Sequence, residues 1–358
     1  MKKRLFFSVF AVFSVFASSQ QNHLKGTITY IGNEGFMIES QGKKVLIDAL
    51  YYSTMTGIFN SDAATREKMI HGTAPFDSTQ LLLISHTHDD HYSQQMTIDY
   101  LFKNPQSMLV APSTITDSVK NYDLRKNIIS ENPVKYQKID TTINGISVST
   151  FSLVHKLRIN IYNVGFFVNI KGFKVFHAGD NVLDDTTEYI RYNIAQYQPD
   201  VALLNYTAFW QADAQREFVK KFIKPRFIIL MHIPKGQAAT VKQQVDDLQS
   251  SMSDTSFPPI VVFENSLESC IITDTIEQTN TRISSSRAPD IQIFPNPCKD
   301  WGNINSSFSG DVVFYNSMGV LKKRIKLTNP ATKINLSDLS SGLYFVSHNG
   351  YSISFIKE

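Results

Sequence analysis

Four potential metal ligands lie within one six-residue segment, residues 86–91, which reads His-Thr-His-Asp-Asp-His. One residue separates this segment from the apolar run 81–84, so we predict a short loop at the end of a buried strand. Imidazole and carboxylate groups together suit Zn²⁺ and its neighbours among the divalent ions. A single tetrahedral ion cannot use the whole segment, which therefore predicts two metal positions completed from elsewhere in the chain. The candidates in the segment are His86, His88, Asp90 and His91.

Three more candidates occur where other apolar runs stop, as expected for side chains presented at one rim of a sheet. They are His155 after residues 151–154, Asp180 after residues 173–176 and the tripeptide His-Ala-Gly, and His232 after residues 227–231. Each of them alone would be interpreted as an ordinary core, surface or turn residue. Their shared position after strand-like segments favours metal ligands, whereas His177 is expected to be structural.

The ordered pattern of His-x-His-x-Asp-His, an isolated His, Gly-Asp and a last His resembles the metallo-β-lactamase-fold hydrolases over roughly residues 24–275. This resemblance implies an α/β (α+β) protein built as a four-layer αββα sandwich. Within that superfamily, the sequences His-Ala-Gly-Asp at 177–180 and Pro-Asp-Val-Ala-Leu-Leu-Asn at 199–205 are most similar to the lactonase-like branch, typified by ascorbate-6-phosphate lactonase.

The resemblance implies a division of the ligands between two ions. A first ion would bind His86, His88 and His155, a second would bind Asp90, His91 and His232, and Asp180 would bridge both. Two such ions, expected to be Zn²⁺ with Mn²⁺ as the alternative, can share a hydroxide that attacks the substrate. Asp90 is also the candidate catalytic residue, because it could orient the attacking water or accept its proton.

The function implied by this pattern is hydrolysis of an ester, lactone or phosphodiester in a small molecule. Two alternatives stay open at this stage. A mononuclear iron dioxygenase of the same fold would use only His86, His88 and His155, and a non-catalytic surface protein would use its metal for stability alone. Elemental analysis separates the first alternative from the hydrolase.

Other residues are candidates for supporting roles near the same rim. Asp48 ends the run 45–47 and could accept a hydrogen bond from a ligand imidazole, with a simple turn as the alternative. Five residues on predicted loops could line a substrate pocket or serve only in loop packing: Tyr51, Tyr52, Asn205, Tyr206 and Trp210.

The N-terminus has the layout of a secretory signal peptide, residues 1–19: a basic start, a short apolar segment and small residues at the cleavage site. Without Lys2, Lys3 and Arg4, the remaining basic residues equal the 32 acidic ones in number. No basic stripe remains, so nucleic acid is not an expected partner. Cys270 and Cys298 are expected to be isolated structural thiols.

The end of the chain predicts a second domain. Residues 276–291 are polar and are expected to form a linker, and residues 292–358 predict short strands of a small C-terminal β-sandwich. Phe-Pro-Asn-Pro at 294–297, Asn-Ser-Met-Gly at 316–319 and Ser-Gly-Leu-Tyr at 341–344 resemble the sorting domain of type IX secretion cargo.

That resemblance implies a Gram-negative bacterium, export through the periplasm, and a secreted or cell-surface protein whose partner is the type IX machinery. The alternative is an adhesive or carbohydrate-binding β module. The oligomeric state is not predicted by the sequence.

Overall fold

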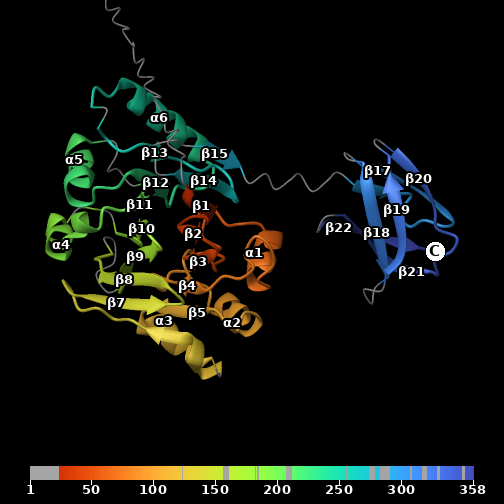
Figure 1. Cartoon of the computed structure of the whole chain (residues 1–358), viewed down its shortest axis with the longest axis horizontal. Helices are drawn as coiled ribbons and strands as arrows, with labels where there is room; N and C mark the ends of the chain where they lie inside the picture. The colour runs from red at the N-terminus through yellow and green to blue at the C-terminus, as the bar shows by residue number, and fades with distance from the viewer. Residues whose placement is uncertain are drawn as a thin grey trace, which may run out of the picture. The chain divides into compact units, whose positions relative to one another are not determined.

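The computed structural model describes residues 24–358 except 123, 156–160, 182, 184, 207–211, 255, 274–278, 283–290, 307–308, 317–320, 329–330 and 349–350. The predicted signal peptide lies outside the described residues. The chain divides into two compact units, one comprising the residues up to 266 with 270–280, and one comprising 267–269 with 281–358 (Figure 1). No helix in the described part of the chain combines the length and apolar character needed to cross a bilayer.

The first large sheet of the first unit contains eight strands in the order β15-β14-β1-β2-β3-β4-β5-β6. Strands β1, β2 and β3 form two antiparallel hairpins, and β3 to β6 then run parallel. The hairpin turn between β2 and β3 has positive φ at Gln41 and Gly42, which matches the twist of the flanking strands. The strands are β1 (Leu24–Gly32), β2 (Gly35–Ser40), β3 (Lys43–Ile47), β4 (Leu81–Leu83), β5 (Met108–Ala111), β6 (Ile128–Ser130), β14 (Glu268–Thr273) and β15 (Thr279–Arg282).

The second large sheet contains seven strands in the order β13-β12-β11-β10-β9-β8-β7. Strands β7 to β10 are antiparallel neighbours, and β10 to β13 are parallel. The strands are β7 (Lys138–Ile143), β8 (Ile146–Ser152), β9 (Val164–Ile170), β10 (Phe173–His177), β11 (Val201–Asn205), β12 (Phe227–Met231) and β13 (Ile260–Val261). The parallel strands β4 and β12 are continuous, fully buried apolar runs, as expected when both faces of a strand are covered.

Helices cover the two sheets from outside. Helices α1, α2 and α3 accompany the first sheet, and α4 and α5 lie on the opposite side beside the second (Figure 1). One continuous core joins the sheets and includes Ile38, Val45, Phe151 and Phe166. The helices are α1 (Ala63–Ile70), α2 (Gln94–Lys103), α3 (Ser113–Val119), α4 (Thr186–Tyr192), α5 (Asp213–Phe222) and α6 (Ala238–Ser251), with 3₁₀ turns at Lys120–Tyr122, Arg125–Asn127 and Ile194–Tyr197. The predicted αββα sandwich is confirmed.

The second unit is a small β structure with two sheets, ordered β16-β17-β20 and β19-β18-β21-β22. A shared core that includes Ile304, Phe314, Leu336 and Phe355 lies within it. The strands are β16 (Ile291–Phe294), β17 (Trp301–Ser306), β18 (Gly310–Asn316), β19 (Leu321–Leu327), β20 (Ala331–Asn335), β21 (Gly342–His348) and β22 (Tyr351–Lys357). The predicted C-terminal β domain is confirmed, and both cysteines are buried free thiols as expected.

One correction concerns the predicted linker, residues 276–291. It contains strand β15, which adds to the edge of the first sheet, and it ends at the start of β16. An edge strand needs hydrogen bonds on one side only and no apolar alternation, so the polar sequence Thr-Asn-Thr-Arg gave no signal of it.

Candidate metal centre

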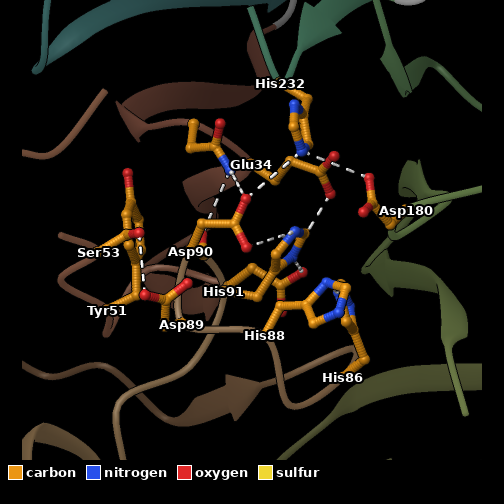
Figure 2. Close-up of polar contacts among 12 residues, drawn as sticks. Glu34, Tyr51, Ser53, His86, His88, Asp89, Asp90, His91, Asp180 and His232 are labelled. Atoms are coloured by element: carbon orange, nitrogen blue, oxygen red, sulfur yellow. Dashed lines mark hydrogen bonds and ion pairs between the residues drawn. The ribbon is translucent and has the colours of Figure 1, made fainter. Parts of the chain in front are cut away.

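The candidate site is built from loops that follow strands of both large sheets. The segment after β4 supplies the histidine cluster, the loops after β10 and β12 supply one residue each, and the β1–β2 turn adds another (Figure 2). The loop after β8 supplies one more residue. Ends of parallel strands lie at one edge of a sheet, so side chains far apart in the sequence meet there. These residues are His86, His88, Asp90, His91, His155, Asp180, His232 and Glu34.

A first group of potential ligand atoms comes from His86, His88, His155 and Asp180, all within 4.8 Å of one another. Nε2 of His155 lies 2.8 Å from Oδ2 of Asp180. Nε2 of His88 is buried and has no hydrogen-bond partner in the described structure. Burial lowers the pKa of His86, which keeps its imidazole neutral as metal binding requires.

A second group contains Glu34, His91, Asp180 and His232, again with ligand atoms within 4.8 Å of one another. Asp90 adjoins this group, because its Oδ2 lies 3.4 Å from Nε2 of His232 and its Oδ1 lies 3.9 Å from Nε2 of His91. Oδ1 of Asp90 and Nε2 of His91 are also buried without hydrogen-bond partners in the described structure. The predicted second set and the predicted bridging residue are therefore brought together.

Asp180 belongs to both groups. Its Oδ2 faces His155, and its Oδ1 lies 3.6 Å from Nε2 of His232. The preceding Gly179 has φ 56°, and the backbone N–H of Asp180 donates to Oδ1 of Asn163 at 3.1 Å. This turn directs one carboxylate between the two sets of imidazoles.

Glu34 joins the candidate ligands although it was not predicted from the sequence. This residue lies in the tight turn between β1 and β2, where Asn-Glu-Gly is typical of an ordinary exposed hairpin turn. A register shift between Tyr30 and Gly32 precedes the turn, and such bulges re-aim neighbouring side chains. Glu34 is fully buried, and burial raises the pKa of its carboxyl group strongly.

Asp48 holds the orientation of His91, a candidate ligand, in agreement with one of the two interpretations of Asp48. Its Oδ2 accepts a hydrogen bond from Nδ1 of His91 at 2.9 Å, and its Oδ1 accepts from the backbone N–H of Ser85 at 2.7 Å. The Ser85 hydroxyl also donates to Oδ2. With Nδ1 of His91 occupied in this way, Nε2 faces the other ligands.

We expect Asp48→Asn to reduce affinity for metal by about 10- to 100-fold, because outer groups that orient ligand imidazoles contribute on this scale. Asn tolerates the positive φ of 44° at this position, so the backbone should persist. Competition with a chromophoric chelator measures the affinity. Unchanged affinity in a folded variant would contradict the positioning role.

Of the residues that could line a pocket or serve in loop packing, Tyr51 is buried and donates its hydroxyl to the carbonyl of Phe59, which agrees with loop packing. Tyr52 is exposed beneath the guanidinium of Arg66. Asn205 instead contacts the site itself, and Trp210 lies outside the described residues. Tyr51 follows the buried residues Ala49 and Leu50, and its ring is buried with them.

His177 is structural, as expected. Its Nε2 donates to the backbone carbonyl of Glu34 at 3.0 Å, and its Nδ1 accepts from the backbone N–H of Gly179 at 3.0 Å. Both ring nitrogens are used, and burial lowers the pKa of the ring. The residue thereby ties the β1–β2 turn to the end of β10.

Four acidic side chains gather at the site. Within the described residues, every ion pair of the four carboxylates of Glu34, Asp48, Asp90 and Asp180 is with a histidine. Burial would lower the pKa of His232, but its hydrogen bond with Asp90 and the nearby charges raise that pKa to about 9. Burial would raise the pKa of Asp90, but His232 and His91 lower it to about 2. Such a field attracts cations.

Comparison with known proteins agrees with this geometry. Residues 27–232 match the model of the β-lactamase superfamily domain, and the chain therefore belongs to that superfamily. Residues 292–358 match the secretion system C-terminal sorting domain. The solved structure of Igni18, a metallo hydrolase from Ignicoccus hospitalis, is similar in fold with a TM-score of 0.50 and 18% identity, covering 70% of this chain and 99% of that one.

Curated relatives specify the class further. A UPF0173 metal-dependent hydrolase of Pyrococcus furiosus is 27% identical over 220 residues, which cover 57% of this chain and 83% of the relative. A protein of the same description from Thermococcus onnurineus is 24% identical over 215 residues, covering 57% and 83%. The protein is a metal-dependent hydrolase of the metallo-β-lactamase superfamily, and its sorting domain indicates secretion or cell-surface localisation through the type IX system.

Proposed function

We propose that the protein is a dinuclear hydrolase that is exported and cleaves an ester, lactone or phosphodiester of a small molecule. The observation that carries this proposal is the convergence of unpartnered buried atoms from two neighbouring ligand groups that share Asp180. Charge supports the count of two, because two dications carry as many positive charges as the four carboxylates carry negative ones. Buried charges that lack such compensation are strongly unfavourable.

The proposed ligands of the first ion are His86, His88 and His155, and those of the second include Asp90, His91 and His232, with Asp180 between them. Zn²⁺ suits the first position, where three imidazoles and one carboxylate would make a four-coordinate set. When bound, two such ions supply a water molecule ionised near neutral pH and polarise the attacked group.

In this proposal Asp90 is the catalytic residue as well as a ligand of the second ion. Asn33 donates to Oδ2 of Asp90 at 3.1 Å and to its backbone carbonyl at 3.3 Å, which fixes the carboxylate. Oδ1 is left without a partner in the described structure and faces the cluster. A carboxylate so placed can orient the attacking water and accept its proton.

The substrate is proposed to be small. A hollow of about 230 Å³ lies beside His155 and is lined by residues 152–155 and 161–163. Val154 and Tyr162 give the hollow an apolar side. His155 also lines it and belongs to the first group of candidate ligands. Its volume lies below the usual range of pockets for drug-sized ligands, which favours a compact ester or lactone.

The proposed route of export combines the signal peptide at residues 1–19 with the sorting domain at residues 292–358. The hydrolase domain is proposed to span residues 24–275. The machinery of type IX secretion is then the partner of the tail, and the substrate is met outside the cell or at its surface.

We expect Asp90→Asn to lower turnover by about 10²- to 10⁴-fold, the range of general acid–base contributions. The assay is a panel of a p-nitrophenyl ester, a lactone and bis-p-nitrophenyl phosphate, with the metal content of each sample measured in parallel. Asp89→Asn is the matched control, because Asp89 is exposed and accepts from the Ser53 hydroxyl at 3.0 Å, away from the ligands (Figure 2). Full activity of the Asp90 variant, or a silent wild type across the panel, would overturn the proposal.

A further inference from the structure

We propose that Glu34 is a ligand of the second metal position and that, through it, this position prefers a six-coordinate, oxygen-seeking ion such as Mn²⁺. This inference rests on the proposed dinuclear centre. It assigns a role to a residue outside the seven predicted ligands and a different ion preference to each of the two positions.

The burial of Glu34 demands a positive partner. The side chain is fully buried, and its Oε2 has no hydrogen-bond partner in the described structure. Its only ion pair among the described residues is with Nδ1 of His91 at 3.5 Å, and that nitrogen is already bonded to Asp48 at 2.9 Å. A carboxylate removed from water without compensation is very costly, so this arrangement indicates an additional cation.

Glu34 lies among the residues proposed to bind the second ion. Figure 2 shows its carboxylate among His232, Asp180 and His91. Ligand atoms of these four residues lie within 4.8 Å of one another. The amide of Asn205 donates to Oε1 of Glu34 at 3.3 Å and to Oδ1 of Asp180 at 3.0 Å, so it orients both carboxylates while leaving their other oxygens for a metal.

The two positions differ in the chemistry of their donors. The first group has three imidazoles and one carboxylate, a set that fits tetrahedral Zn²⁺. The second group, with Asp90 beside it, has three carboxylates and two imidazoles. Five donors exceed a tetrahedral set, and carboxylate oxygen suits Mn²⁺ and similar hard ions. Glu34 supplies both the extra donor and the added oxygen character.

The test compares wild type with Glu34→Gln, which keeps the size of the side chain and removes its charge. Metal-free protein receives one equivalent of Zn²⁺ and is then titrated with Mn²⁺, with free Mn²⁺ followed by electron paramagnetic resonance. We expect wild type to bind one Mn²⁺ per chain. In the variant, the affinity for Mn²⁺ should fall by on the order of 100-fold, which is at least as much as the loss of a group that only orients a ligand. Binding of the first Zn²⁺ should be unchanged.

A matched control is Glu131→Gln. Glu131 is also buried, but each of its oxygens accepts a hydrogen bond from a threonine, Thr141 or Thr150. This variant should bind Mn²⁺ like wild type and should melt at a lower temperature. Metal-free Glu34→Gln should instead melt at no lower a temperature than metal-free wild type, because Oε2 of Glu34 makes no hydrogen bond in the described structure that the substitution could remove.

Equal Mn²⁺ affinity in Glu34→Gln and wild type would overturn the inference while leaving the dinuclear hydrolase standing. A wild type that binds fewer than two ions would overturn the proposed function itself. If Glu34→Gln does not fold, Glu34→Asp serves in its place: it keeps the charge on a shorter side chain, and unaltered Mn²⁺ affinity in that variant would also count against a direct metal bond.

Discussion

Replacing Asp180 with asparagine should reduce hydrolysis by on the order of 1,000-fold, the upper end of what removal of one preorganised charge-stabilising group costs. It should also lower the occupancy of both metal positions together. The reason is that one carboxylate faces His155 at 2.8 Å and His232 at 3.6 Å and belongs to both ligand groups. Steady-state kinetics and elemental analysis of the same preparation measure the two effects.

Asp200→Asn provides the control for this substitution. Asp200 is equally an aspartate with little exposure, but it pairs with Lys25 at 3.0 Å and with Arg226 at 2.8 Å. Its loss should lower stability without changing metal content. If Asp180→Asn kept either metal position fully occupied, the shared role of Asp180 would have to be abandoned.

Replacing Gly179 with alanine should lower the free energy of unfolding of the metal-free protein by about 2–4 kcal/mol. One part of this cost is the left-handed backbone, with φ 56°, which disfavours any side chain. The other part is steric: an added Cβ would lie 2.4 Å from Oδ1 of Asn163 and 2.7 Å from the carbonyl oxygen of Val164. Because Asn163 also accepts from the backbone N–H of Asp180, the variant should bind metal more weakly as well.

Gly42→Ala separates the two parts of that cost. Gly42 has φ 74°, and an added Cβ would meet nothing within 4 Å. This variant should lose only about 1 kcal/mol and should keep its metal affinity. Chemical denaturation in the presence of a chelator measures both variants, since bound metal would otherwise add to the apparent stability. Equal losses for the two substitutions would show that the contacts of Gly179 are unimportant.

Much of the candidate site could be predicted from the sequence because its signals are local. The cluster at residues 86–91 is contiguous, and His155, Asp180 and His232 each follow an apolar run that is a buried strand in the structure. Strand-end loops of parallel strands share one edge of a sheet, so position along the chain implied position in space. The αββα class followed from the resemblance of the ordered ligand pattern to the metallo-β-lactamase-fold hydrolases, and the β-rich tail followed from its short strand-like runs separated by turn residues.

The tertiary structure decided what local pattern could not express. Glu34 and Tyr51 have neighbours along the chain that resemble those of ordinary loop residues, yet one lies among the ligands and the other packs inward. The sequence around Asp48 fits a turn and a supporting role equally well, and the position of His91 beside it decides for the supporting role. Strand β15 forms because an edge of the first sheet is available, without any apolar signal of its own. In each case the deciding partner is distant in sequence, and only the packing of the two sheets specifies which distant groups meet and whether water is excluded around them.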